Sequence, residues 1–425
     1  MRPPGQVVEI ARTLQDAGFA AWCVGGAVRD ALLGLAHLDW DLATSATPQQ
    51  VRRLFKRTVP VGIAFGTIGV LDREGRMHEV TTFRHDVQTD GRHAVVQFGA
   101  SLDEDLARRD FTINAIAYDP IAQVLHDPFD GRGDLARRLV RAVGMADERM
   151  REDRLRALRA IRFAARFDFA IDVDTWKAIV SSAPHLTRLS PERVKQELDK
   201  TMEQVARPSV ALTRWRDSGA FAVLIPTLAA VPDASLRAVD ALPLPVLASR
   251  PLRKPLRFAA LFSACEGEGA EHALRALRFS NQDVATIASL VDRYGRFGRD
   301  LGVSLAQGQV PTDAVLRRLA ASVGRLRVSA FIRLCVACWQ PLPDASGRAA
   351  MRRVTLRLYR RLMQIAFRDA IEIADLAVDG DDLRRAGIAA GPQLGRTLQR
   401  LIDAVIDDPT RNTPATLLAL ALAHE

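Results

Sequence analysis

The pattern of hydrophobic and polar positions changes once along the chain. Up to about residue 140, short stretches with helical spacing alternate with apolar, β-branched runs of strand length. From Ala142 onward strand signals disappear, and nearly every segment repeats its apolar residues with helical spacing, with breaks near prolines. We therefore predict an α/β head, built from a mixed sheet with helices, followed by an all-α remainder.

Within the head, turn and capping residues mark the element ends. Val7 to Ala17 has helical spacing and is closed by Gly18, after which Phe19 to Val24 is expected to be a buried strand. Thr47 to Gln50 (TPQQ) opens a helix, because threonine caps it, proline fits the first turn and glutamine closes a capping box. Two apolar runs around the turn REGR are predicted to pair as a hairpin, namely Thr67 to Asp72 and Met77 to Phe83.

Three other segments have weaker signals. Arg84 to Gly99 has little periodicity and mixes charge with glycine, so a mobile loop is expected. Pro341 to Gly347 has the composition of a linker and precedes a strongly basic helix, Met351 to Arg361. Cys335 and Cys338 form an isolated CxxC in an apolar helical run, so we interpret them as small buried residues rather than as redox or metal ligands.

Composition limits the classes of function. The 425 residues are 48% hydrophobic and 26% charged, as in a folded protein of about two to four domains. The formal charge of +9 comes mainly from arginine, which binds phosphate bidentately. A nucleic acid is the leading partner, and a genomic bias toward arginine is the alternative. Four cysteines make no disulfide framework, and the sequence has no apolar signal core or membrane-spanning run, so we expect a cytoplasmic protein with no membrane partner.

The first stretch with candidate chemistry is Val24 to Thr44, VGGAVRDALLGLAHLDWDLAT. Gly25 and Gly26 allow backbone amides to approach a phosphate closely, and Arg29 can neutralise its charge. A short apolar helix is expected to follow at Ala31 to Leu35. The stretch therefore predicts a phosphate-binding turn.

The same stretch carries a pair of carboxylates. Asp39 and Asp41 are one residue apart, so on an extended strand both point to one face while Trp40 points to the other. Two such carboxylates repel each other unless a cation lies between them, although acidic surface pairs are common. Glu79 lies on a later predicted strand and supplies a third carboxylate. The group could hold Mg²⁺ ions that activate a hydroxyl and stabilise a phosphoryl displacement.

Two arginine-rich motifs follow. Arg108, Arg109 and Asp110 precede an apolar stretch and could bind triphosphate oxygens and a ribose hydroxyl; the alternative is a surface salt bridge. On a helix from residue 151, the spacing i, i+3, i+6 would place a carboxylate and several guanidinium groups on one face, where they could bind a base edge, or form an exposed charged face. These residues are Asp153, Arg156, Arg159 and Arg162.

Taken together and in order, the motifs resemble the class II nucleotidyltransferases, which include bacterial tRNA CCA-adding enzymes and bacterial poly(A) polymerases. The matching pieces cover most of residues 20 to 200: GGAVRDALLG, DWDLATSATPQQVRRLF, FGTIGV, EVTTFRHD, RRDFTINAIAYDP, HDPFDGRGDL, EDRLRALRAIRFAARFDF and LSPERVKQEL. The stretch FGTI and residues 375–412 are more similar to the CCA-adding enzymes, and no His-Asp phosphohydrolase signature appears in the C-terminal half.

The resemblance implies a polymerase-beta-type nucleotidyltransferase palm at 1–140, a helical neck with the base pocket at 141–205, a helical body at 206–345 and a tRNA-binding tail at 346–425. It also implies residue roles. Asp39, Asp41 and Glu79 would be catalytic, with Asp39 and Asp41 as Mg²⁺ ligands. Gly25, Gly26, Arg29 and Arg109 would bind the nucleotide, Asp110 would help to select ribose, Asp153 and Arg156 would pair with the base, and Arg159 and Arg162 would line its pocket.

We therefore expect an enzyme that adds CCA to the 3′ end of tRNA from CTP and ATP with Mg²⁺, binding the tRNA 3′ end and acceptor arm, as a monomer or homodimer. Residues 84–99 would be the loop that lets the site pass from C to A addition, with Gln88 where an aromatic residue is more usual. The alternatives are an enzyme that adds only A or only CC, a poly(A) polymerase, or a catalytically inactive RNA-binding module.

Overall fold

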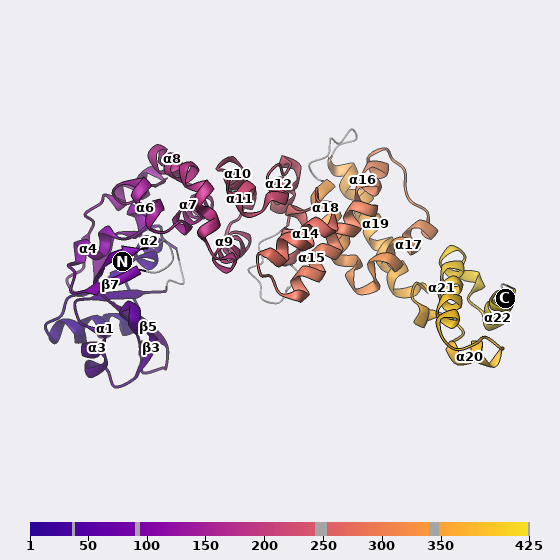
Figure 1. The fold of residues 1–425 in the computed structure, drawn as a ribbon, viewed down its shortest axis with the longest axis horizontal. Helices are drawn as coiled ribbons and strands as arrows, with labels where there is room; N and C mark the ends of the chain where they lie inside the picture. The colour runs from indigo at the N-terminus through magenta and orange to yellow at the C-terminus, as the bar shows by residue number, and fades with distance from the viewer. Residues whose placement is uncertain (36–38, 90–93, 243–252, 340–347, 424–425) are drawn as a thin grey trace. The chain divides into compact units, whose positions relative to one another are not determined.

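The computed structural model describes residues 1–35, 39–89, 94–242, 253–339 and 348–423. It forms two compact units, Met1–Ala229 and Ala230–Glu425, which are described separately (Figure 1). The first unit contains a seven-stranded mixed sheet and a set of helices, and the second is helical in the residues that are described. The predicted fold class, an α/β head followed by an all-α remainder, is confirmed.

The sheet of the first unit has the strand order β3-β4-β5-β2-β1-β8-β9. The strands are β1 (Ala21–Val24), β2 (Asp41–Thr44), β3 (Thr58–Gly62), β4 (Thr67–Leu71), β5 (Met77–Thr82), β8 (Ala117–Asp119) and β9 (Val124–His126). Only β2 and β5 pair in parallel; the other neighbours are antiparallel. The predicted hairpin is therefore confirmed as β4 and β5, in which Gly69 pairs with Glu79.

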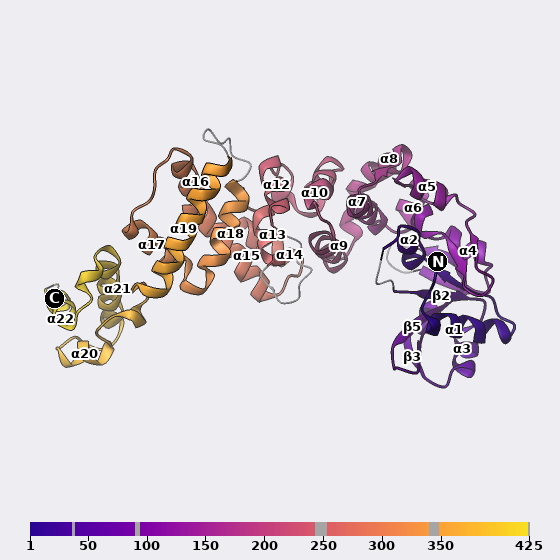
Figure 2. The same cartoon turned by 180° about the vertical axis from the view of Figure 1, so that it is seen from behind.

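One face of this sheet is covered by two helices, α1 (Gly5–Asp16) and α3 (Pro48–Leu54), which contact β1, β2, β4 and β5 (Figures 1 and 2). The side chains at the centre of this face are fully buried, namely Leu42, Ile68 and Val80. The predicted capping box of α3 is present, with the Thr47 hydroxyl accepting from the Gln50 amide and the Gln50 side chain accepting from the Thr47 amide.

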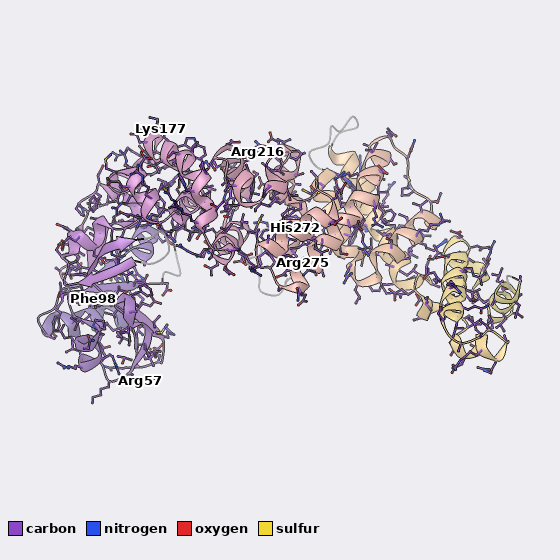
Figure 3. The ribbon with its side chains drawn as sticks, in the orientation of Figure 1. Arg57, Phe98, Lys177, Arg216, His272 and Arg275 are labelled. Carbon is purple, nitrogen blue, oxygen red and sulfur yellow. The ribbon has the colours of Figure 1, made fainter. Side chains whose placement is uncertain are left out.

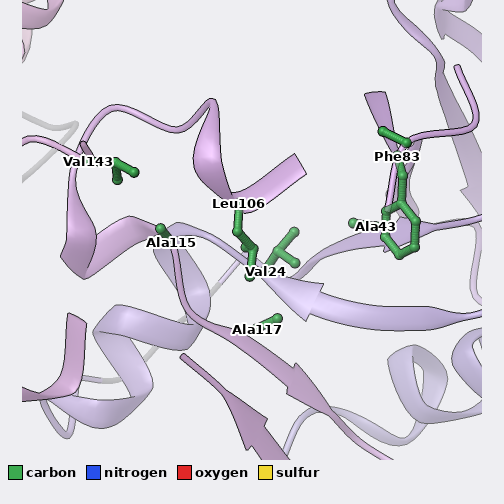
Figure 4. Close-up of a cluster of buried hydrophobic side chains, with 8 residues drawn as sticks. Val24, Ala43, Phe83, Leu106, Ala115, Ala117 and Val143 are labelled. Atoms are coloured by element: carbon green, nitrogen blue, oxygen red, sulfur yellow. The ribbon is translucent and has the colours of Figure 1, made fainter. Parts of the chain in front are cut away.

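The opposite face of the sheet is covered over only part of its width. Around β1, β2 and β8 it is closed by a cluster that includes Leu106 of α4 (Leu102–Ala107), as Figure 4 shows. The cluster consists of Val24, Ala43, Phe83, Ala100, Leu106, Ala115, Ala117 and Val143. Because Asp41 pairs with Val24 and is level with Glu79, this face is the one that carries the candidate catalytic carboxylates.

Several predicted boundaries are corrected. Residues 84–99 were expected to form a mobile loop without strands, but β6 (Arg84–Thr89) and β7 (Ala94–Phe98) pair antiparallel. Residues 90–93 lie outside the described ranges. The helix expected at Ala31–Leu35 is α2 (Gly26–Leu32), which starts directly at the second glycine. One short strand, β11 (Ala170–Ile171), occurs after residue 142 and pairs with β10 (Leu139–Val140).

The helices that complete the first unit are α5 (Gly131–Arg137), α6 (Ala146–Glu152), α7 (Leu155–Phe167), α8 (Val173–Ser182), α9 (Pro191–Gln204), α10 (Pro208–Asp217) and α11 (Ala220–Leu224). Of these, α6, α8, α9 and α10 contact α7. One side of α7 is apolar, because Leu155, Leu158 and Ile161 are buried, as their spacing predicts. The other side carries the arginines of the candidate site.

The second unit is described by helices alone. They are α12 (Asp233–Asp240), α13 (Arg253–Leu261), α14 (Gly267–Ala276), α15 (Asn281–Arg293), α16 (Arg299–Ala306), α17 (Asp313–Val323), α18 (Val328–Trp339), α19 (Arg348–Arg368), α20 (Gly380–Arg385), α21 (Pro392–Asp407) and α22 (Pro414–Leu422). Cys335 and Cys338 are buried free thiols, as predicted, and burial raises the pKa of Cys338 to about 11. The predicted linker 341–347 lies outside the described residues. No described helix combines the length and apolar character needed to span a membrane.

Candidate active site

The three candidate carboxylates lie near the start of two neighbouring inner strands, β2 and β5, on the open face of the sheet. Asp41 begins β2 and is level with Glu79 on β5, while Asp39 precedes β2 and is exposed. Burial, together with the charges of Glu79 and Asp39, raises the pKa of Asp41 to about 6, and the charge of Arg109 opposes this shift. Within the described residues, no group of three His, Cys, Asp or Glu side chains has a geometry that holds a metal ion as it stands. The carboxylates are thus repelling neighbours that a cation would stabilise.

The glycine pair connects β1 to α2 directly beside Asp41. Val24, the last residue of β1, pairs with Asp41, so the turn at Gly25 lies at the same height as the carboxylates. Gly25 has φ 75°, and a Cβ at this position would lie 2.8 Å from Nη1 of Arg109. Both the left-handed backbone and the close guanidinium require a residue without a side chain here.

Arg109 lies between the glycine turn and the carboxylates. Its Nη2 pairs with Asp105 at 3.2 Å, and its charge lowers the pKa of Asp41. The Nε of Arg109 is buried and has no hydrogen-bond partner among the described residues. A buried N–H without a partner is costly, so Arg109 is prepared to donate to a ligand that enters the site.

Arg29 is more enclosed than the sequence indicates. Its side chain is 4% exposed, and its guanidinium lies 5.0 Å and 4.7 Å from the ring centroids of Phe163 and Phe167 on α7. Nε donates to Asp30 at 2.6 Å and Nη1 donates to Asn114 at 2.5 Å. In this arrangement Arg29 connects α2 to the segment that follows Asp110.

Asp110 is the centre of a buried hydrogen-bond network. One of its oxygens accepts from the amide of Phe111 and from Asn114 at 2.8 Å, and the other accepts from Nε and Nη2 of Arg159 at 2.8 and 2.7 Å. Burial alone would raise the pKa of Asp110, but the charge of Arg159 and the hydrogen bonds of Asn114 and Arg159 hold it below its ordinary value. Asn114, which the sequence reasoning did not identify, therefore joins Arg29 to Asp110.

The predicted helical face with Asp153 is corrected. Helix α6 ends at Glu152 and α7 begins at Leu155, so Asp153 lies in the break between them with an extended backbone. Its side chain pairs with Arg193 of α9 at 2.7 Å. Arg156 pairs with Glu152 at 2.6 Å and donates to the carbonyl of Arg108 at 2.8 Å. Asp153 and Arg156 are thus near each other in the chain, each held by its own partner.

Arg162 completes the arginine row of α7. It pairs with Glu197 of α9 at 2.6 Å, and both side chains are almost fully buried. Burial lowers the pKa of Arg162, and the charge of Glu197 opposes that shift. Glu197 was also missed from the sequence, although its neighbours in helical spacing on α9, Val194 and Thr201, are buried.

The basic segments of the second unit differ in how they are used. Arg317, Arg318 and Arg325 form ion pairs with Asp369, Asp407 and Asp375, so they stabilise contacts between helices. On α19, Arg353, Arg357 and Arg360 are exposed.

Comparisons with known proteins give consistent results. Residues 21–141 match the family model for the poly A polymerase head domain, and residues 168–231 match the model described as a probable RNA and SrmB-binding site of polymerase A. The CCA-adding enzyme of Geobacillus kaustophilus (strain HTA426) is 38% identical over 99% of this chain and 97% of its own. That of Lactobacillus delbrueckii subsp. bulgaricus (strain ATCC BAA-365 / Lb-18) is 32% identical over 97% and 96%.

Solved structures are similar over the same length. The crystal structure of Bacillus stearothermophilus CCA-adding enzyme in complex with CTP has a TM-score of 0.72 and 33% identity, covering 100% of this chain and 98% of that chain. The Thermotoga maritima CCA-adding enzyme complexed with tRNA has a TM-score of 0.66 at 21% identity, covering 99% and 95%, which is a likeness of fold.

Proposed function

This chain belongs to the class II nucleotidyltransferase family of the bacterial CCA-adding enzymes, and on that premise we propose that it adds C, C and A to the 3′ end of tRNA from CTP and ATP, releasing pyrophosphate. The reaction is an attack of the RNA 3′ hydroxyl on the α-phosphate of the incoming nucleotide. The arrangement that best supports it is the group of Asp39, Asp41, Glu79 and Arg109. It combines repelling carboxylates with a guanidinium N–H that has no hydrogen-bond partner in the described part of the chain.

The metal in this proposal is Mg²⁺, held by Asp39 and Asp41 with Glu79 beside them. The raised pKa of Asp41 supports the fit, because burial and the charges of Glu79 and Asp39 both destabilise its carboxylate, which a bound cation would stabilise. Carboxylate oxygens are preferred Mg²⁺ ligands. When bound there, Mg²⁺ would supply Lewis-acid activation of the hydroxyl and charge neutralisation at the phosphate.

The triphosphate is assigned to the side of the carboxylates where β1 meets α2. Gly25 and Gly26 leave room for it, and Arg109 can donate its free Nε–H to an oxygen. Arg29 is proposed to act on the same group mainly by fixing the turn, since Asp30 and Asn114 already engage its guanidinium. A ribose hydroxyl can bind Asp110 by replacing one of the two Arg159 donors.

Base choice is assigned to the start of α7. Asp153 offers acceptors and Arg156 offers donors, which together match the edges of cytosine and adenine. Arg159 and Arg162 lie on the same side of α7 and line the pocket in this proposal. The four parts at 1–140, 141–205, 206–345 and 346–425, the tRNA-binding role of the tail and a cytoplasmic location belong to the same proposal.

The test is extension of a tRNA that ends before CCA, with labelled CTP and ATP supplied separately and together. Product length distinguishes full CCA addition from CC-only addition, A-only addition and poly(A) synthesis. Asp41→Asn should keep the fold and reduce incorporation by at least about a thousandfold, because the metal loses a ligand. Asp16→Asn, an exposed carboxylate of α1, is the matched control and should behave as wild type. Retained incorporation in Asp41→Asn would contradict the metal assignment.

A further inference from the structure

An exposed apolar strip lies on the catalytic face of the sheet. Val59 and Val61 of β3 and Met77 of β5, here called the β3 strip, are 38%, 44% and 45% exposed. On the opposite face, Ile68 of β4 and Val80 of β5 are fully buried, and Pro60 of the edge strand β3 is exposed. The strip is therefore a separate surface feature and does not belong to the core beneath α1 and α3.

The strand register places this strip in line with the catalytic carboxylates. Val59 pairs with Gly69, Gly69 pairs with Glu79, and Glu79 is level with Asp41. Paired residues share a face, so the four positions form one row across the sheet. Neighbouring strands are about 4.8 Å apart, so Val59 lies roughly 10 Å from Glu79 along the row.

Gly69 provides the surface on which the strip packs. A Cβ at Gly69 would lie 2.6 Å from Sδ of Met77 and 3.0 Å from Cγ2 of Val61, so both side chains lie over this glycine. The result is a shallow apolar floor that begins directly beside Glu79. Arg57, exposed and immediately before β3, adds a positive charge at the same sheet edge (Figure 3).

The chemistry of the proposed reaction indicates what lies on this floor. Phosphoryl displacement requires the attacking and leaving oxygens to be roughly in line, on opposite sides of the phosphorus. The glycine turn and Arg109 hold the triphosphate on the β1 side of the carboxylates. The attacking hydroxyl must then approach from the other side, where β5, β4 and β3 follow in order.

We propose that the β3 strip binds the 3′-terminal nucleoside of the RNA substrate and positions its hydroxyl beside Glu79. This inference rests on the proposed function and assigns it a second substrate subsite. The terminal base is first whichever base precedes CCA and then cytosine, so a surface that contacts different bases without reading their edges is required. Aliphatic side chains meet that requirement because they offer no hydrogen-bonding groups. Arg57, whose Nη1 donates to the carbonyl of Asp72 at 3.0 Å, is exposed and presents its positive charge to the RNA backbone.

The test uses the full-length protein with the double variant Val59→Thr/Val61→Thr, which keeps shape and β-propensity while replacing a methyl group by a hydroxyl at each position. The KM for tRNA should rise about fifteenfold, because each of the two methyl groups lost from the contact contributes a factor of about four. The kcat and the KM for CTP should stay within about twofold of wild type. The rise should be the same for tRNAs ending before CCA, after the first C and after the second C.

Two matched variants complete the design. Val124→Thr changes a 50% exposed valine of β9, at the other edge of the same sheet, and should leave every constant unchanged. Val61→Ile keeps the apolar surface and should retain the wild-type KM for tRNA. A melting temperature equal to that of wild type verifies that the double variant is folded.

Three results would overturn the inference: an unchanged KM for tRNA in the double variant, an equal rise in the KM for CTP, or a wild-type dimer that the double variant converts to a monomer in sedimentation. Each of these leaves wild-type tRNA extension intact. Failure of the proposed function is distinct, because the wild-type protein would then extend no tRNA.

Discussion

The buried pair of Arg162 and Glu197 gives the prediction that the structure supports most directly. The two side chains are 4% and 1% exposed and meet at 2.6 Å, and the guanidinium also lies 4.4 Å from the ring centroid of Phe163. Glu197→Gln keeps the size of the side chain but removes its charge. Arg162 would then be a buried cation facing a neutral amide, with only the more distant contacts of its surroundings to compensate.

The expected magnitude follows from this burial. Breaking one side of a buried ion pair costs about 3–5 kcal/mol, because the remaining charge keeps its desolvation penalty. The first unit spans Met1–Ala229, and for a unit of this size each kcal/mol lowers the melting temperature by about 2–4 °C, so the shift is roughly 10 °C. Calorimetry of the full chain measures the shift, and hydrogen exchange of the α7 and α9 amides localises it.

Two comparisons determine whether this reasoning holds. Asp174→Asn breaks an exposed pair with Lys177 and should change stability by less than about 0.5 kcal/mol. Arg162→Met/Glu197→Met replaces both charges by apolar side chains and should recover most of the stability that the single variant loses, without recovering normal nucleotide binding. The reasoning is refuted if Glu197→Gln and the Asp174→Asn control have the same melting temperature. It is also refuted if Arg162→Met/Glu197→Met is no more stable than Glu197→Gln.

Three further predictions follow from the site. Gly25→Ala should raise the KM for CTP about tenfold, because the added methyl group meets the guanidinium of Arg109. Gly34→Ala is the control: its φ of 72° is similar and nothing lies within 4 Å, so it should cost only backbone strain. Steady-state kinetics of both variants measures the difference. Because the pKa of Asp110 is lowered in the folded state, its stabilisation is complete above the unfolded value of about 4 and is lost as pH falls through the folded pKa. Urea unfolding of wild type and Asp110→Asn should therefore differ by a constant amount above about pH 5 and converge below it. Arg193→Met should reduce discrimination between CTP and ATP by about fivefold, since Asp153 loses a part-exposed ion pair worth up to about 1 kcal/mol. Competition assays with both nucleotides measure this, and an unchanged ratio of CTP to ATP incorporation would contradict it.

The local elements of the head were predictable because their signals are local. The capping box at Thr47 and the alternation of β4 and β5 depend on residues within a few positions of each other, and both are present in the structure. The carboxylates at Asp41 and Glu79 were identified from their strands, and strand pairing then made them neighbours.

The remaining features depend on contacts between distant segments. Asn114 acquires its role from Arg29, 85 residues away, and Glu197 acquires its role from Arg162, 35 residues away. No local spacing rule connects residues so far apart in the sequence. Asp153 was placed on a helix by its spacing, but the chain leaves the helix there, and a partner 40 residues away on α9 fixes its side chain. In residues 84–99, the low periodicity gave no strand signal, although β6 and β7 pair with each other as a separate two-stranded sheet.

The arginine row of α7 connects the surroundings of Asp110 to those of the glycine turn through one helix. Arg159, Arg162 and Arg166 pair with Asp110, Glu197 and Asp30, which belong to three different segments. Asp30 also holds Arg29, which reaches Asp110 through Asn114, so the ion pairs form a closed network between the glycine turn and the base-side helix. A displacement of α7 would therefore disturb the surroundings of Asp110 and of the glycine turn together. Because each charge has a partner before substrate arrives, the proposed pocket can be preorganised without the repulsion that clustered arginines would otherwise produce.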